Sequence, residues 1–191
     1  MEQSSTGGAF NPNVPTSTFA HLPEPVFLSM KRLLLLGCLV LAASLVWAGC
    51  DTAEQQNEFE DQAFSLPSGF TRTDRNGEIL SEDTDDWRTS PVYSTRVLVD
   101  PAFPNPVPPG EFVTIPVQVR EFNSVQGGLE LVSFDENRIP RRLDDIRDAS
   151  DPGAYIFTFN PALLGVPGLV RVFILDSRGG LVSYGDLLVE Q

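Results

Sequence analysis

Few residues of this chain could carry chemistry, and Cys50 is the most informative of them. It follows two small residues, Ala48 and Gly49, which close an uncharged apolar run over 33–47. A cationic start, an apolar run of about 7–15 residues and small residues at the cut are the parts of a secretory signal. We therefore predict cleavage between Gly49 and Cys50.

The signal itself starts at Met30, because Lys31 and Arg32 supply its cationic part. Its apolar run is too short to cross a hydrocarbon core, which takes about 20 residues. We assign 30–49 to a signal peptide and interpret 1–29, which is rich in Gly, Ser, Thr and Pro, as the product of a misplaced start codon. A genuine disordered extension ahead of an internal anchor helix is the alternative.

The stretch Trp47-Ala48-Gly49-Cys50 resembles the lipobox of bacterial lipoproteins, in which the cysteine is acylated and becomes the new N-terminus. The resemblance implies a diacylglycerol and an N-acyl chain on Cys50, and stable anchoring takes more than one chain. Trp47 departs from the pattern, since an aliphatic residue is usual there. Ordinary signal cleavage is the alternative, although it would leave an exposed thiol in an oxidising compartment.

Carboxylates on turns are a second candidate chemistry. They fall in two runs, one with Asp74 and Asn76 and one with Asp83, Asp85 and Asp86. Hard oxygen ligands suit Ca²⁺, but neither run has the EF-hand spacing. Calcium is thus a possible cofactor of a surface adhesin, and solvated acidic loops are the alternative.

Cleavage before Cys50 removes His21, Lys31 and Cys38, which are the only histidine, the only lysine and the other cysteine. The removed residues include two of the 13 cationic side chains and two of the 26 carboxylates. The processed chain therefore has 142 residues, with 11 arginines, 24 carboxylates and a net charge of −13. Serine and cysteine triads, histidine-ligated zinc, Schiff bases and P-loops are excluded. A glycosidase-type carboxylate pair is not excluded by residue type, but we predict no enzyme.

The acidity also restricts the partners. Nucleic acids and anionic lipid surfaces both select cations, so we expect neither to bind through charge. A high net charge favours a soluble, monomeric domain.

Two segments should precede the folded domain. Residues 50–65 are polar and acidic and predict a flexible tether, or else a surface-export signal of the kind some Bacteroidota-type lipoproteins carry after the cysteine. Residues 66–91 form an entry segment, in which Asn76-Gly77 predicts a hairpin. Trp87 should anchor this segment on the domain edge, with Arg88 available to a carboxylate.

Residues 92–191 indicate β structure throughout. Pro116 predicts an edge strand or a bulge, Gly185 a bulge, and the run around Arg171 a central strand. The cationic patch 138–142 should pair with nearby carboxylates, and no amphipathic helix of useful length is expected. Strands are predicted at 93–99, 112–119, 129–134, 154–159, 169–175 and 181–190. This spacing indicates an all-β fold, an immunoglobulin-like antiparallel sandwich of about seven strands without a disulfide or a core tryptophan.

Phe103-Pro104-Asn105-Pro106 with Gly110 resembles the opening of type IX secretion C-terminal sorting domains and of related flagellar-hook-cap immunoglobulin-like domains. With the stretches 85–88, 168–172 and 184–189, the layout is similar to small uncharacterised secreted proteins of Bacteroidota-like bacteria. The chain departs from the sorting pattern in ending with Glu190-Gln191 instead of a basic strand, and in carrying a lipobox.

These features predict an exported lipoprotein, anchored at the periplasmic face or the cell surface of the outer membrane. Its β domain would be a non-enzymatic binding or structural module with an envelope protein as partner. A carrier of a sorting-type domain is the second hypothesis, and a calcium-binding adhesin is a more distant one.

Overall fold

A computed structural model describes residues 52–135, 137–165 and 167–190. The predicted extension 1–29, the signal 30–49 and the cleavage and lipidation residues Gly49 and Cys50 lie outside the described residues. The predictions for them therefore remain predictions.

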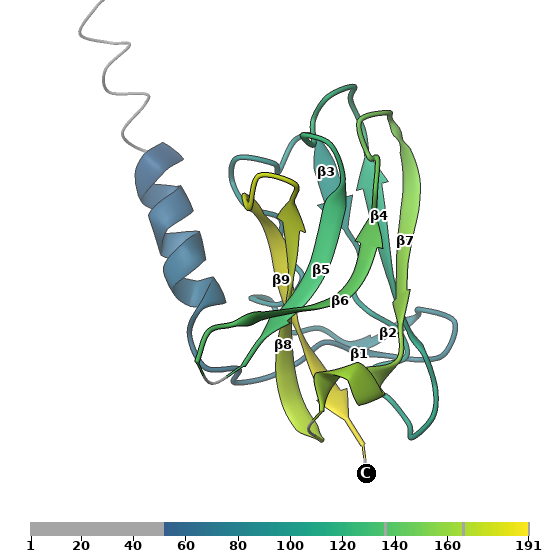
Figure 1. Ribbon diagram of the computed structural model, residues 1–191. Coiled ribbons are helices and arrows are strands. Elements are labelled where there is room, and N and C mark those ends of the chain that lie inside the picture. The colour runs from purple at the N-terminus through teal and green to yellow at the C-terminus, as the bar shows by residue number, and fades with distance from the viewer. Residues whose placement is uncertain (1–51, 136, 166, 191) are drawn as a thin grey trace, which may run out of the picture. The chain divides into compact units, whose positions relative to one another are not determined.

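The described chain is built mostly of strands, which form three antiparallel sheets (Figure 1). The all-β prediction is confirmed, with nine strands where about seven were expected. Two strands form a small separate sheet, three form a sheet in the order β3-β4-β7, and four form a sheet in the order β6-β5-β8-β9. The strands are β1 (Arg72–Thr73), β2 (Ile79–Ser81), β3 (Val97–Val99), β4 (Val113–Val119), β5 (Leu129–Phe134), β6 (Pro140–Ile146), β7 (Gly153–Phe159), β8 (Gly168–Asp176) and β9 (Leu181–Val189).

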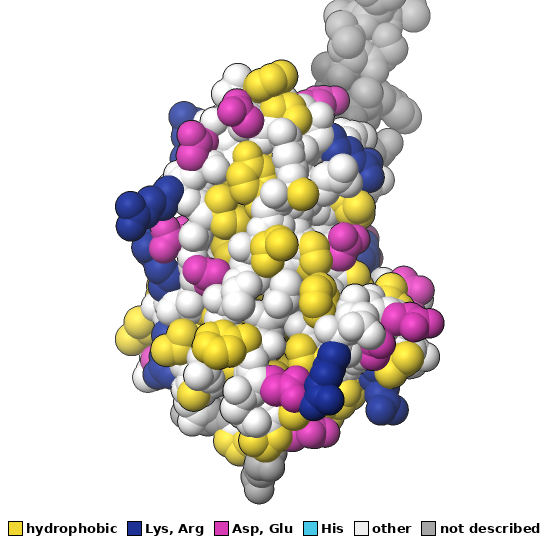
Figure 2. Space-filling model, turned by 90° about the vertical axis from the view of Figure 1, so that its right-hand side faces the viewer, with side chains coloured by type: hydrophobic (Ala, Val, Ile, Leu, Met, Phe, Trp, Pro, Cys, Tyr) yellow, Lys and Arg dark blue, Asp and Glu magenta, His cyan; other side chains and the backbone are white. Residues whose placement is uncertain are grey.

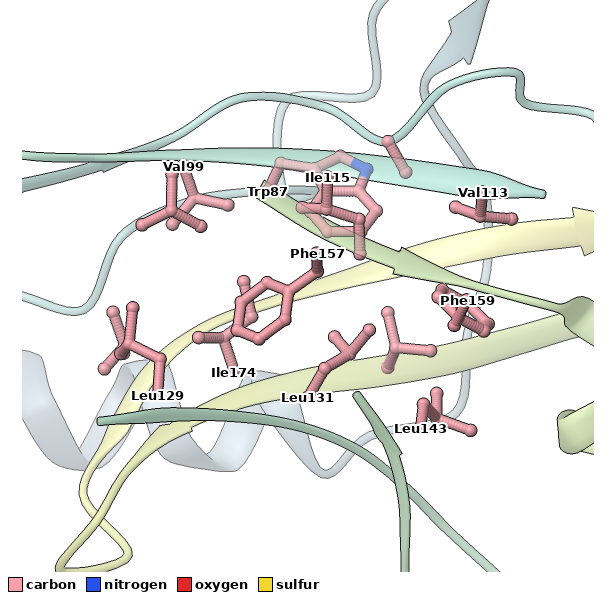
Figure 3. Close-up of a cluster of buried hydrophobic side chains, with 14 of the residues drawn as sticks. Trp87, Val99, Val113, Ile115, Leu129, Leu131, Leu143, Phe157, Phe159 and Ile174 are labelled. Carbon is pink, nitrogen blue, oxygen red and sulfur yellow. The ribbon is translucent and has the colours of Figure 1, made fainter. Parts of the chain in front are cut away.

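The two larger sheets share one hydrophobic core (Figure 3). Successive side chains of a strand point to opposite faces, so every second residue of β4 is buried. Ile115 of β4 and Phe157 of β7 pack in the same cluster as Leu129 and Leu131 of β5. Each fully buried side chain of this kind contributes about 1.5–3 kcal/mol, which explains how the fold holds together without a disulfide.

Pro116 does not place β4 at an edge, and the prediction of an edge strand or bulge is wrong. β4 lies between β3 and β7, with an unbroken register to β7. The Pro116 carbonyl accepts a hydrogen bond from the Asp100 amide, 3.1 Å away, so this residue faces β3. Proline has no backbone N–H to donate. The place where this group would be lies opposite the chain just past Val99, where β3 has already ended.

The predicted bulge at Gly185 is also absent, because Gly185 pairs in register with Val172 of β8. The irregularity of this ladder lies between Ile174 and Leu175 instead. β8 has β5 on one side and β9 on the other, so the central-strand prediction is confirmed. The hairpin around Asn76-Gly77 is confirmed as well, as the pair β1–β2.

Residues 52–63 form a helix, so the expectation of a flexible tether over this segment is wrong (Figure 1). Phe59 and Ala63 are buried and Gln56 is half-buried, a spacing of three and four residues that puts all three on one helical face. This face packs on a second cluster, on the outer side of the four-stranded sheet, with Phe173 and Tyr184. Isolated helices this short are marginal in water, so the docking surface is what stabilises it.

Two further segments differ from expectation. Of the predicted strand 93–99, only 97–99 is extended, because residues 91–96 form turns that are closed by hydrogen bonds to the carbonyls of Ser90 and Tyr93. The cationic stretch 138–142 belongs largely to β6, an edge strand that the sequence pattern did not indicate.

Candidate functional site

The first predicted calcium run closes the β1–β2 hairpin. The Asp74 Oδ1 atom accepts hydrogen bonds from the amides of Asn76 and Glu78, each at 2.8 Å. These bonds lower the pKa of Asp74, because they favour its charged form. Asp74 and Asn76 therefore serve the turn that joins the two strands.

The second run ties the entry segment to the sheet. The Asp86 carboxylate accepts the Thr71 amide at 2.8 Å and the Asp186 amide of β9 at 2.6 Å. Burial raises the pKa of Asp86 to about 7, and the nearby Asp186 carboxylate adds to this. Asp83 and Asp85 lie close enough that their mutual hydrogen bond raises the pKa of Asp83.

The five predicted metal ligands do not form a shared site. Within the described residues, no three or more His, Cys, Asp or Glu side chains converge as a metal ion would require. The carboxylates of the two runs have backbone or carboxyl partners of their own.

Trp87, expected at the domain edge, lies in the main core with 5% of its surface exposed (Figure 3). A core tryptophan is thus present, although it comes from the entry segment. Its amide donates to the Tyr184 carbonyl at 3.0 Å, and its indole lies against the α-carbon of Gly185. A side chain at position 185 would overlap the indole ring, which is why this position carries glycine.

Arg171 of β8 is the central residue of the site. Its side chain is buried and faces Asp186 of β9, with Nε and Nη2 donating to the two carboxylate oxygens at 2.7 and 2.6 Å. The guanidinium also lies 4.7 Å from the centre of the Tyr184 ring, a favourable position for a cation.

The remaining nitrogen of Arg171 receives the end of the helix. Nη1 donates to the carbonyls of Gln62, Ala63 and Ser65 at 2.8, 3.1 and 3.1 Å. The last carbonyls of a helix lack partners within it and carry partial negative charge. Arg171 thus caps the helix 52–63 with a cation while it neutralises Asp186.

Other contacts fix the same helix along its length. Near its start, Ser90 Oγ donates to Gln56 Oε1 at 2.8 Å. Phe59 packs on Tyr184 with ring centres 5.2 Å apart. Arg88, expected to pair with a carboxylate, instead donates to Gln62 Oε1 at 3.0 Å.

Asn105 is buried and joins the entry segment to the last strand. Its Nδ2 donates to the carbonyls of Thr71 and Asp186 at 2.8 and 2.9 Å, and its Oδ1 accepts the Leu188 amide at 3.0 Å. Asp86, Trp87 and Asn105 together cover the outer edge of β9, which would otherwise present unpaired backbone groups.

Of the cationic stretch 138–142, Arg142 pairs with carboxylates as expected, whereas Arg141 has backbone partners. Arg142 contacts Glu130 at 2.6 Å and Asp145 at 3.7 Å. Arg141 donates to the carbonyl of Leu163 at 2.9 Å, in the short 3₁₀ helix η1 (Pro161–Leu164).

The outer face of the three-stranded sheet is a second candidate surface. Figure 2 shows hydrophobic and uncharged atoms over the middle of this side of the molecule, with charged side chains toward its rim. Leu98, Pro116 and Ile156 point outward here, and Ile156 is 60% exposed. The outward side chains of β4 and β7 carry no charge: Thr114, Pro116, Gln118, Ala154, Ile156 and Thr158.

No protein-family model matches this sequence, and no curated protein or solved structure matches it either.

Among the hollows in the described surface, one of about 440 Å³ lies between Pro108, Pro161 and Val189. It is open and lined mostly by proline, glycine and aliphatic residues.

In the part of the chain that the structure describes, no helix has the length and apolar character needed to cross a membrane.

The sequence missed the helix-docking role of Arg171, although a signal for it was present. A charged residue inside an apolar central strand requires a buried partner, and Asp186 is the acidic residue of the neighbouring apolar run. The sequence pattern did not indicate that the third guanidinium nitrogen of Arg171, Nη1, would donate hydrogen bonds to carbonyls of the helix 52–63.

Proposed function

We propose that this chain is an exported lipoprotein, cleaved after Gly49 and acylated on Cys50, whose β domain is a non-enzymatic binding or structural module of the cell envelope. One observation carries the proposal. The described helical residues 52–63 follow Cys50 closely in the sequence, and they are docked on the domain through Phe59 and Arg171. Cleavage at the predicted site would therefore place the lipid close in sequence to a segment that is fixed on the β domain.

We further propose that the two larger sheets form an immunoglobulin-like sandwich. Three strands in the order β3-β4-β7 face four in the order β6-β5-β8-β9, and the chain crosses between the sheets after β4, β6 and β7. Seven strands in two facing antiparallel sheets with such crossings are typical of that architecture. The hairpin β1–β2 and the helix are additions to it.

A non-enzymatic role is supported by what the processed chain contains. It has no histidine and no lysine, and its net charge is −13. The buried Arg171–Asp186 pair is directed at helix carbonyls, so it serves the fold. The uncharged face around Ile156 supports a binding role, because a protein partner can cover it without desolvating charges.

The experiment that tests this proposal is metabolic labelling with a fatty acid, followed by the mass of the N-terminal peptide. The expected product begins at an acylated Cys50, and the uncleaved precursor should accumulate when the lipoprotein signal peptidase is inhibited with globomycin. Cys50→Ser is the matched control and should incorporate no label. A mature chain that retains Met1, or that begins at an unmodified cysteine, would refute lipidation.

Delivery to the outside gives the second measurement. Surface exposure is probed with an external protease on intact cells that express the wild type or Cys50→Ser. If the unlipidated variant still reaches the surface, the sorting-type alternative is favoured over the anchor. Truncation of β9 is not suitable for this purpose, because Leu187 is fully buried in the core.

A further inference from the structure

We propose that one end of the β domain faces the membrane and contacts it through Phe122 and Val92. This membrane-proximal end consists of the loops 90–96, 120–128, 147–152 and 176–180. The inference rests on the proposed acylation of Cys50, and it adds an orientation that lipidation by itself does not imply.

The helix 52–63 has a defined direction on the four-stranded sheet. Its C-terminal carbonyls are held by Arg171, which is the fourth residue of β8. Its first turns lie beside Ser90, whose amide donates to the Val182 carbonyl at the start of β9. The helix therefore runs along the sheet, and its N-terminus lies at the end where β9 begins (Figure 1).

Cys50, which would carry the proposed lipid, is only two positions before residue 52 in the chain. A chain spans at most about 3.6 Å per residue, so Cys50 lies within about 7 Å of residue 52. A flexible tether over 50–65 would have allowed an excursion of about 20–24 Å, at roughly 5–6 Å times the square root of its length. Because the helix is docked, the lipid is confined to one end of the domain.

The strand register places the four loops at that same end. Val119 at the end of β4 lies beside Val97 and Gly153, where β3 and β7 begin. Leu129 at the start of β5 lies beside Ile146 and Asp176, where β6 and β8 end.

Hydrogen bonds between the loops hold this end together. Tyr93 Oη donates to Asp176 Oδ2 at 2.8 Å, the Arg120 amide donates to the Arg96 carbonyl at 2.8 Å, and the Asn123 amide donates to the Ser150 carbonyl at 2.7 Å. The membrane-proximal end is therefore one connected surface built from both sheets.

The composition of this surface suits a lipid headgroup region. Phe122 is 72% exposed and Val92 is 45% exposed. The loops carry four arginines, at 96, 120, 147 and 178, and four carboxylates, at 121, 148, 151 and 176. They are thus electrically neutral, and the net charge of −13 resides in the rest of the processed chain. Anionic lipids would repel that remainder and not this end.

A bilayer-depth measurement on the lipidated protein tests the orientation. After acylation of Cys50 and loss of Cys38 with the signal, an introduced cysteine is the only free thiol of the chain. Phe122→Cys is labelled with a fluorophore in vesicles of phosphatidylethanolamine and phosphatidylglycerol that contain a lipid-borne quencher. Ile139→Cys is the matched control, since Ile139 is 60% exposed in the β5–β6 turn at the opposite end.

The expected result is quenching at position 122 several-fold stronger than at position 139. Adding Phe59→Ala, which loosens the helix, should reduce this difference while the lipid anchor is retained. Equal quenching at both positions, or a difference unaffected by Phe59→Ala, would overturn the inference.

The mass of the N-terminal lipopeptide separates the two proposals. An acylated protein with equal quenching leaves the lipoprotein proposal intact and refutes the orientation alone. A protein without acyl chains refutes the lipoprotein proposal, and the orientation with it.

Discussion

Arg171 of β8 lies opposite Asp186 of β9, and two hydrogen bonds of 2.7 and 2.6 Å join the guanidinium to both carboxylate oxygens. The third nitrogen of the same guanidinium reaches the last carbonyls of the helix 52–63. One side chain thus links the pairing of two strands to the docking of the segment that follows the predicted lipidation site.

Arg171→Leu should lower the free energy of unfolding by about 3–5 kcal/mol, because it leaves Asp186 buried without its partner. Chemical denaturation monitored by circular dichroism measures this. Arg142→Leu is the control, since that arginine pairs with Glu130 at the surface and such pairs contribute at most about 1 kcal/mol. Equal effects of the two substitutions would contradict the role assigned to Arg171.

The double variant Arg171→Leu/Asp186→Leu separates pairing from docking. Replacing both charges by apolar residues removes the uncompensated carboxylate and should recover part of the lost stability. It cannot restore the cation at the helix C-terminus. Amide hydrogen exchange should therefore remain fast over 52–63 while the sheets regain protection, and full protection of the helix would show that Arg171 is not needed to dock it.

Phe59→Ala should release the helix and leave the β domain folded. Phe59 is 1% exposed and packs on Tyr184, and removing a buried phenylalanine side chain costs about 3–5 kcal/mol. Because the helix is too short to persist alone, hydrogen exchange should become fast over 52–63. Asn57→Ala, on the exposed side of the helix, should leave exchange slow, and similar exchange in the two variants would count against docking through Phe59.

Gly185→Ala should destabilise the domain, because the new methyl group would overlap the indole of Trp87. Overpacking of this kind costs about 1–3 kcal/mol, and the emission of Trp87 should change with it. In Gly153→Ala the added atom would meet the Tyr155 ring at 3.6 Å, an ordinary contact. That control should unfold within about 0.5 kcal/mol of the wild type, whereas a neutral effect at position 185 would argue against the close approach.

The strands were the predictable part of this molecule, because alternation of apolar residues located β4, and apolar runs bounded by turn residues located β5, β7, β8 and β9. The helix was not predictable from pattern, since its buried face consists of Phe59 and Ala63 with the half-buried Gln56 among acidic residues. Its stability comes from a surface on strands more than 100 residues away, which no local window contains. The prediction of a metal site was wrong for a related reason. The carboxylates are close in sequence, but those of Asp74 and Asp86 accept hydrogen bonds from backbone amides and do not converge on a shared site.

The last prediction is a dependence of stability on pH that originates at Asp86. The pKa of this carboxyl is raised to about 7 in the folded protein, chiefly by burial, from an ordinary value of 3.8. Between these values the folded protein holds a proton that the unfolded chain has released. The contribution of Asp86 to the free energy of unfolding should therefore fall as pH rises from about 4 to about 7, and stay level above that.

Asp86→Asn removes this titration. The asparagine side chain would offer one acceptor oxygen instead of two to the amides of Thr71 and Asp186, a loss that does not itself vary with pH. Because the pH-dependent contribution of Asp86 is also removed, the stability deficit relative to the wild type should be largest near pH 4 and should shrink as pH rises to about 7. Urea unfolding from pH 4 to 8 should then give a flatter profile for the variant than for the wild type. Asp74→Asn is the control with the opposite sign, because hydrogen bonds lower the pKa of Asp74. The pH dependence that this control removes lies below about pH 4, where the wild-type carboxylate takes up its proton and loses those bonds, so its stability deficit should be constant from pH 4 to 8. Parallel profiles for wild type and Asp86→Asn between pH 4 and 7 would mean that Asp86 is ionised throughout, held by its two backbone amides against the cost of burial.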